Sequence, residues 1–167
     1  MSLWVLWTAD KTLSSNKPET WLHLKRVVRF GDTDSAGVMH FYQLLRWCHE
    51  AWEESLEIYG LSLKKIFPQA SKLDHEVSIL LPIVHCEANF LGPIEVGDQL
   101  SLELSPEKID HGGFYVKTKF RRDDVKVGIG SIYHRSIDAK TRRSCDLPED
   151  IARWIESSFL NSGIKSI

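Results

Sequence analysis

The chain contains one long stretch with the period of an α-helix, from Phe41 to Tyr59. Apolar residues recur there at steps of three and four, and charged residues fill the positions between them. A helix of about 19 residues is roughly 28 Å long. Gly60, directly after the stretch, is typical of a helix C-terminus. Such a helix has to bury its apolar stripe, so the rest of the chain must supply a broad apolar surface.

The segments on either side of this helix have the alternating pattern of β-strands. One strand is expected at 23–30 before the helix. Four meandering strands are expected after it, at 76–90 with a bend at Pro82, 99–109, 114–120 and 125–137. A closing helix is expected at 148–160, with one apolar face made of Ile151, Trp154, Ile155 and Phe159. Short turns between the last strands predict antiparallel pairing. The expected fold class is α+β, an antiparallel sheet wrapped around one long central helix.

The length of 167 residues fits one compact domain better than two. We place this domain at 21–167, including the closing helix. Residues 1–20 are interpreted as an N-terminal extension, because the run Ser14–Pro18 has the composition of a linker. Two tryptophans of the extension, Trp4 and Trp7, are expected to pack on the domain or on a partner chain.

The overall charge and the cysteines narrow the class of protein further. A formal net charge of −2 gives no electrostatic basis for binding nucleic acid. Cys48, Cys86 and Cys145 are far apart and odd in number, which favours free thiols in a reducing cytoplasm. The chain has no apolar run long enough to span a membrane. Its seven histidines form no HExxH motif, so no metal and no cofactor are expected.

The segment Gly31-Asp-Thr-Asp-Ser-Ala-Gly-Val38 joins the first strand to the long helix and carries two carboxylates, Asp32 and Asp34. A carboxylate can attack a thioester carbonyl directly or deprotonate a water that attacks it. The free N–H groups at the start of the helix can stabilise the negative charge on the carbonyl oxygen. Gly37 allows the tight turn that this arrangement needs. On the residues alone, either carboxylate can take the role.

The longer run Val28–Phe41 resembles the signature of the 4-hydroxybenzoyl-CoA thioesterase family. That signature has an aromatic residue, Asp-x-Asp, a small residue and a glycine before the long helix. The run Phe90–Leu100 also resembles the second and third strands of that family with their Gly-Asp turn. The resemblance covers about residues 22–155. It implies a hotdog fold, an acyl-CoA thioesterase, and a homo-oligomer, either dimer or tetramer, with active sites at the subunit boundary.

The resemblance also assigns roles within the loop. Asp34 matches the catalytic carboxylate, as nucleophile or as general base, and Asp32 is left a structural turn residue. The backbone N–H of Phe41 is the expected oxyanion donor, with the His40 N–H beside it. Some members of the wider family carry a histidine at the position of Phe41, so a catalytic His40 side chain remains an alternative. Glu50 is another, because a different branch of hotdog thioesterases uses a helix glutamate as nucleophile.

The helix segment Leu44–Leu56 is similar to that of a branch of this family, the cyanobacterial 1,4-dihydroxy-2-naphthoyl-CoA hydrolases of phylloquinone synthesis. This resemblance implies an aromatic acyl group, with coenzyme A as part of the substrate. Three alternatives stay open. The first is a fatty acyl thioester of CoA or of a carrier protein. The others are a hydratase or dehydratase that uses Asp34 and His40, and a CoA-binding protein without activity.

Side chains that contact the substrate are harder to choose. Aromatic residues for a flat apolar wall are Trp47, Trp52 and Phe41, although helix aromatics more commonly pack in a core. Basic residues for the phosphates of CoA are Lys117, Lys119 and Arg121, which recur every second residue and share one strand face. Arg135, Arg142 and Arg143 could join them. The alternative is that this strand face is simply solvated.

Overall fold

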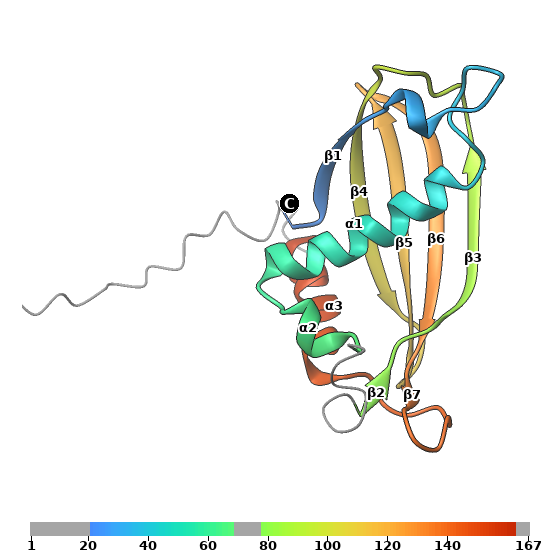
Figure 1. The fold of residues 1–167 in the computed structure, drawn as a ribbon. Coiled ribbons are helices and arrows are strands. Elements are labelled where there is room, and N and C mark those ends of the chain that lie inside the picture. Colours follow the sequence, from blue (N-terminus) through green and yellow to red (C-terminus); the bar gives the residue numbers. More distant parts are fainter. Residues whose placement is uncertain (1–20, 69–77, 163–167) are drawn as a thin grey trace, which may run out of the picture.

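The computed structural model describes residues 21–68 and 78–162, and it shows an antiparallel sheet curved around one long helix (Figure 1). The α+β hotdog architecture predicted from the sequence is confirmed. The extension at 1–20, with Trp4 and Trp7, lies outside the described residues. No helix in the described ranges is both long and apolar enough to cross a membrane.

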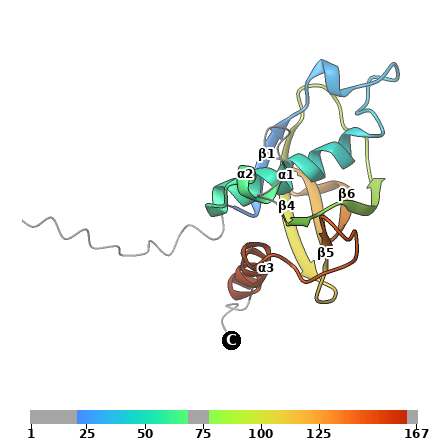
Figure 2. The ribbon, with the colours of Figure 1, turned by 60° about the horizontal axis from the view of Figure 1, so that its bottom comes forward.

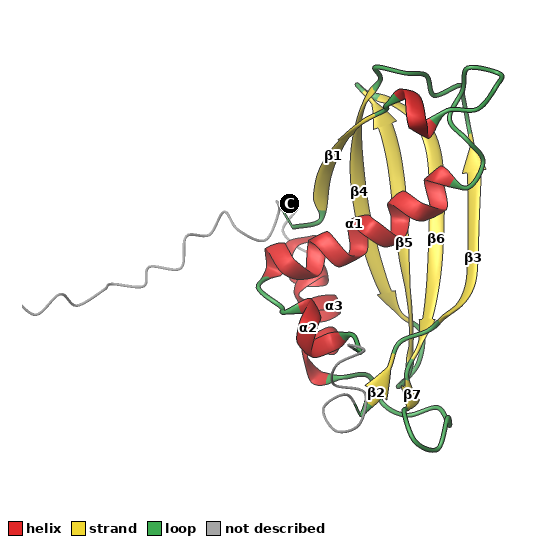
Figure 3. Cartoon of the chain, viewed as in Figure 1, coloured by secondary structure: helices red, strands yellow, loops and turns green. Residues whose placement is uncertain are grey.

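The helices and strands follow one another along the chain with short connections (Figure 3). The first part contains β1 (His23–Val27), a 3-10 turn (Phe30–Asp32), α1 (Gln43–Tyr59) and α2 (Leu63–Ile66). The second part contains β2 (Ile79–Leu80), β3 (Ile83–Phe90), β4 (Gln99–Lys108), β5 (Gly113–Arg122), β6 (Val125–Arg135), β7 (Ile137–Asp138) and α3 (Glu149–Ser162).

The five long strands form one antiparallel sheet in the order β1-β4-β5-β6-β3. The strands β4, β5 and β6 form the expected meander, and Phe114 of β5 faces both Lys108 and His134. The four strands after α1 are nevertheless not a single meander, so that prediction is wrong. The edge of β4 that β3 would have used is occupied by β1, and β3 pairs with β6 on the other side. The connection after β3 therefore crosses the sheet end instead of forming a hairpin.

The helix α1 packs on the concave face of the sheet as predicted. Its buried side chains are Gln43, Leu44, Trp47, Cys48, Ala51, Trp52, Ser55 and Leu56. Two glycines of β6 permit the close approach. A Cβ atom at Gly130 would lie 2.3 Å from Cys48 Sγ, and one at Gly128 would lie 3.2 Å from Leu44 Cδ1. These glycines are required because helix backbone and sheet backbone are too close for a side chain between them.

The strand-to-helix junction is longer than the sequence predicts. The first strand ends at Val27, short of the predicted Phe30, and α1 begins at Gln43 instead of Phe41. Side chains compete with the strand here, because Thr33 Oγ1 donates to the Phe30 carbonyl at 2.8 Å. The predicted C-terminal stop at Gly60 is confirmed, with φ at 105°.

The closing helix α3 lies beside the C-terminal end of α1 in both Figure 1 and Figure 2. Trp154 Nε1 donates to Ser55 Oγ at 3.2 Å, and the Tyr59 and Ser157 hydroxyls are 2.7 Å apart. Ser158 is 5% exposed. The buried stripe of α3 therefore continues through Ser158, and Phe159 is 54% exposed instead of sharing the buried face as predicted.

Candidate active site

The loop that carries Asp34 is a tight turn closed by backbone hydrogen bonds. The Asp34 N–H donates to the Val38 carbonyl at 2.9 Å, and the Gly37 N–H donates to the Asp34 carbonyl at 3.0 Å. Gly37 has φ of 79°, which a residue with a side chain rarely adopts. The Asp34 side chain is exposed, and its Oδ1 accepts from the Ala36 N–H at 2.8 Å. In the described part of the chain its Oδ2 has no recorded partner, so one carboxylate oxygen faces solvent.

Asp32 is bound on all sides. Its Oδ1 accepts from Gln43 Nε2 at 2.7 Å, and its Oδ2 accepts from the Arg29 N–H at 2.7 Å. Its carbonyl accepts from the His40 N–H at 2.8 Å. Both carboxylate oxygens are thus used to hold the loop. This bonding fits the structural role expected for Asp32 and leaves Asp34 as the available carboxylate.

The two amides expected to act as oxyanion donors differ. The His40 N–H is occupied by the Asp32 carbonyl, so it does not fit its predicted role. The Phe41 N–H has no hydrogen-bond partner within the described ranges, and it lies just before the first residue of α1. A free amide at a helix start is the arrangement that stabilises negative charge. Of the two predicted donors, only the Phe41 amide remains available.

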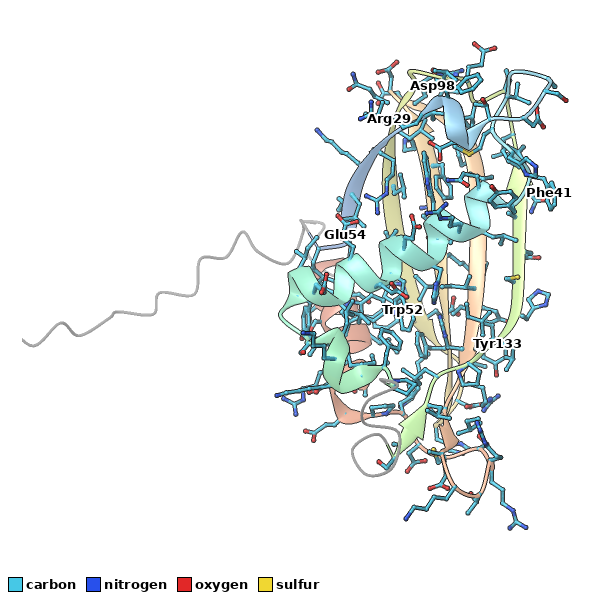
Figure 4. All side chains as sticks on the ribbon, viewed as in Figure 1. Arg29, Phe41, Trp52, Glu54, Asp98 and Tyr133 are labelled. Carbon is cyan, nitrogen blue, oxygen red and sulfur yellow. The ribbon has the colours of Figure 1, made fainter. Side chains whose placement is uncertain are left out.

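Three aromatic rings surround this amide. The His40 ring centroid lies 4.8 Å from that of Phe41 and 4.3 Å from that of Tyr42. The Phe41 side chain is 75% exposed, and Figure 4 shows it projecting from the molecule where α1 begins. His40 Nδ1 is buried and has no hydrogen-bond partner in the described structure. The helix start therefore presents a flat apolar surface beside the loop that carries Asp34.

The helix residues considered for the substrate site lie elsewhere. Trp47 is 4% exposed and belongs to the hydrophobic core. Trp52 is fully buried, 4.1 Å from the His134 ring (Figure 4). Glu50 accepts from Arg46 Nε at 2.6 Å on the exposed side of α1. The core packing of both tryptophans agrees with the common fate of helix aromatics.

The basic residues of β5 lie on the sheet face turned away from α1. Lys117 pairs with Glu107 and Lys119 with Glu103 of the neighbouring strand, each at 3.3 Å. Arg121 donates to the Asp124 carbonyl. Glutamates at the same spacing on β4 could have indicated this pairing from the sequence. A role in binding phosphate stays a prediction.

The other basic candidates are distributed similarly. Arg135 donates to both carboxylate oxygens of Asp110, at 2.8 and 2.9 Å. Arg142 and Arg143 lie in the turn after β7. A surface hollow of about 350 Å³ occurs along β1 and β4, lined by Lys25, Arg26, Val27, Gln99, Leu100, Ser101 and Asp123. Asp34 and Phe41 do not line it, so this hollow is separate from the loop.

Two buried polar residues escaped the sequence analysis. His134 is fully buried between the rings of Trp52 and Phe114, and its Nδ1 lies 3.1 Å from the Leu81 carbonyl. Burial lowers the pKa of His134 to about 4. Gln43 is 2% exposed. The signal for Gln43 was its place one turn before Trp47, on the apolar face of the helix. No cluster of three metal-binding side chains occurs in residues 21–68 and 78–162.

Residues 28–155 match the family model of the thioesterase-like superfamily. The chain belongs to this superfamily. A 1,4-dihydroxy-2-naphthoyl-CoA hydrolase of Prochlorococcus marinus strain SARG is 51% identical over 155 residues, covering 93% of this chain and 100% of the relative. The resemblance predicted from the loop motif is therefore confirmed.

Solved structures of this superfamily have the same fold. A structure from Prochlorococcus marinus strain MIT 9313 is 53% identical with a TM-score of 0.80, covering 84% of this chain and 98% of that one. A 1,4-dihydroxy-2-naphthoyl-CoA thioesterase from Synechocystis is 29% identical with a TM-score of 0.71, covering 80% and 94%. The superfamily fold thus includes the loop and the helix start described above.

Proposed function

We propose that this superfamily member hydrolyses 1,4-dihydroxy-2-naphthoyl-CoA to the free acid and coenzyme A, as a step of phylloquinone biosynthesis. The observation that carries the proposal is the 51% identity to a hydrolase of that name, which extends over the whole relative. The geometry supports a thioesterase, because an available carboxylate and a free amide lie at the two ends of one loop.

Asp34 is the catalytic carboxylate in this proposal. It attacks the thioester carbon to form an anhydride that water cleaves, or it takes a proton from the water that attacks. In both routes the C–S bond breaks, the thiolate takes up a proton, and one water is consumed. The exposure of the Asp34 side chain supports its contact with substrate, since Asp32 is fully engaged in the loop.

The Phe41 amide stabilises the oxygen of the thioester as it gains negative charge. Removing one such donor from an enzyme costs about 10² to 10³ in kcat, so a single well-placed amide has a large effect. The positive end of the α1 dipole adds to it. The exposed rings of Phe41 and Tyr42 supply a flat apolar surface for the naphthoyl group.

The proposal includes a homo-oligomer that forms through β3. This strand is at the edge of the sheet, and its exposed large apolar side chains are Ile83, Val84 and Phe90. An open edge with apolar residues is a surface that proteins normally cover, and a second copy can pair with it across a two-fold axis. Sedimentation should show a dimer or tetramer, and Val84→Arg should shift it towards monomer. A wild-type monomer would contradict this part. The free thiols Cys48, Cys86 and Cys145 support a reducing cytoplasm as the compartment.

The activity is tested by thiol release from a panel of acyl-CoA thioesters. The panel contains 1,4-dihydroxy-2-naphthoyl-CoA, 4-hydroxybenzoyl-CoA, palmitoyl-CoA and a long-chain acyl carrier protein. We expect the naphthoyl thioester to have the largest kcat/KM. Preference for a long acyl chain, or no turnover of any aromatic thioester, would refute the proposal. Enoyl absorbance measured alongside separates hydrolysis from a hydratase reaction.

A further inference from the structure

Gln43 is the one buried polar side chain of α1 that contacts the loop carrying Asp34, among the residues that the structure describes. Its Nε2 donates to Asp32 Oδ1 at 2.7 Å, and its backbone N–H donates to the His40 carbonyl at 2.9 Å. Asp32 and His40 are joined in turn by the 2.8 Å bond between the His40 N–H and the Asp32 carbonyl. The first residue of α1 is thus bonded to both ends of the turn that contains Asp34.

The chemistry of this contact fixes which end of the amide faces the loop. An ionised carboxylate only accepts hydrogen bonds, so Gln43 must present its NH₂ group to Asp32. The Gln43 Oε1 is then directed elsewhere, and it is buried without a hydrogen-bond partner in the described ranges. Buried acceptors are normally paired, and an unpaired one is a cost that a purely structural position would avoid. An apolar residue at this position of the helix would avoid it.

We propose that Gln43 is a positioning residue for hydrolysis. By ordering Asp32, it sets where the Asp34 carboxylate stands relative to the Phe41 amide. The inference rests on the proposed function, because it assigns Gln43 a role in the same site. The loop between residues 34 and 41 contains Gly37 in a left-handed conformation and is otherwise largely exposed. A misplacement of about 1 Å in an active site can cost about 10²-fold in rate.

Replacing the donor by an acceptor tests the contact directly. In Gln43→Glu the two carboxylates meet at hydrogen-bonding distance and cannot both be ionised. Arg46 of α1 also interacts with Asp32, but its guanidinium is hydrogen-bonded to Glu50. We expect kcat at pH 8 to fall by about 10²-fold, with KM changed by less than about 3-fold. Relative to wild type, activity should recover towards pH 5.5, where the pair shares a proton.

A donor–acceptor exchange provides the matched control. In the double variant Asp32→Asn with Gln43→Glu, the oxygen of the introduced asparagine can accept from the Arg29 N–H while its NH₂ donates to the introduced carboxylate. This variant keeps every bond of the contact with the roles of donor and acceptor reversed. We expect its kcat at pH 8 to lie within about 5-fold of wild type, well above the expected loss of about 10²-fold in Gln43→Glu alone. A Gln43→Leu variant, which lacks the contact, should lose activity equally at both pH values.

Amide hydrogen exchange adds a readout that does not need turnover. We expect Gln43→Leu to accelerate exchange at residues 33–41 while residues 47–56 of α1 stay protected. Wild-type kcat in Gln43→Glu at pH 8, no rescue by the exchange variant, or unchanged exchange of the loop would each overturn the inference. A wild-type enzyme that cleaves none of the thioesters would instead refute the proposed function, and the exchange data would still decide whether Gln43 orders the loop.

Discussion

The C-terminal half of α1 is enclosed by protein, whereas its first residues face solvent. Trp52 is fully buried and Ser55 is bonded to α3, while the Phe41 side chain just before the helix is 75% exposed. Apolar contacts hold the enclosed half. The open end is held by polar contacts to Asp32, and these leave an amide and a carboxylate available. The difference teaches that stability and chemistry are separated along one helix. Changes at the two ends should therefore affect different measurements.

The largest effect expected at the open end is loss of activity in Asp34→Asn. Asparagine keeps an oxygen to accept from the Ala36 N–H, so the turn should persist. Losing the nucleophile or base should lower kcat by about 10³-fold, or about 4 kcal/mol in activation free energy. The measurement is steady-state hydrolysis with thermal unfolding in parallel. Unchanged kcat would contradict the assignment, and Asp32→Ala should instead lower the unfolding temperature.

The next effect lies in the enclosed half and depends on pH. The pKa of His134 is lowered to about 4 by burial, from an ordinary value of 6.5. The unfolded state therefore binds the proton more readily than the folded state does. Stability is fully present above about pH 6.5 and decreases as pH falls towards about 4, by on the order of 3 kcal/mol. Urea unfolding of wild type and His134→Phe at several pH values should show a weaker acid loss in the variant. Parallel curves would rule this out.

A smaller effect is expected where α1 approaches the sheet. A methyl group at residue 130 would lie 2.3 Å from Cys48 Sγ, so Gly130→Ala should cost about 1–3 kcal/mol of unfolding free energy. Adding Cys48→Ala should recover part of this loss, because it removes the clashing sulfur. Gly92→Ala is the matched control, since nothing lies within 4 Å of a Cβ at residue 92. Equal stability of Gly130→Ala and wild type would mean that the helix can shift away.

The smallest effect is expected on the outer sheet face. Lys119 is 44% exposed in its pair with Glu103, so Lys119→Ala should change the unfolding free energy by less than about 0.5 kcal/mol. The same variant tests the predicted phosphate contact. A KM for the CoA thioester that rises several-fold, with the KM for a pantetheine thioester unchanged, would support the contact. An unchanged KM for both would leave Lys119 as a solvated surface residue.

Local patterns predicted most of this fold, because the period of a helix or strand depends on neighbouring residues. The helix end at Gly60 and the strands β4 to β6 followed from such patterns. Phe159 did not, since its burial depends on where α3 crosses the end of α1. The position of β3 also depended on a distant partner, because β1 already occupies the free edge of β4.

The candidate site divides in the same way. The sequence determined that two carboxylates precede the helix, and the family resemblance selected Asp34. Only the tertiary structure decided how they differ, because Gln43 is 11 residues from Asp32 along the chain and meets it only after α1 has docked on the sheet. It also decided that the His40 amide is occupied and the Phe41 amide is not. A hydrogen bond between distant residues needs the folded backbone to bring donor and acceptor together, and no local pattern records that distance.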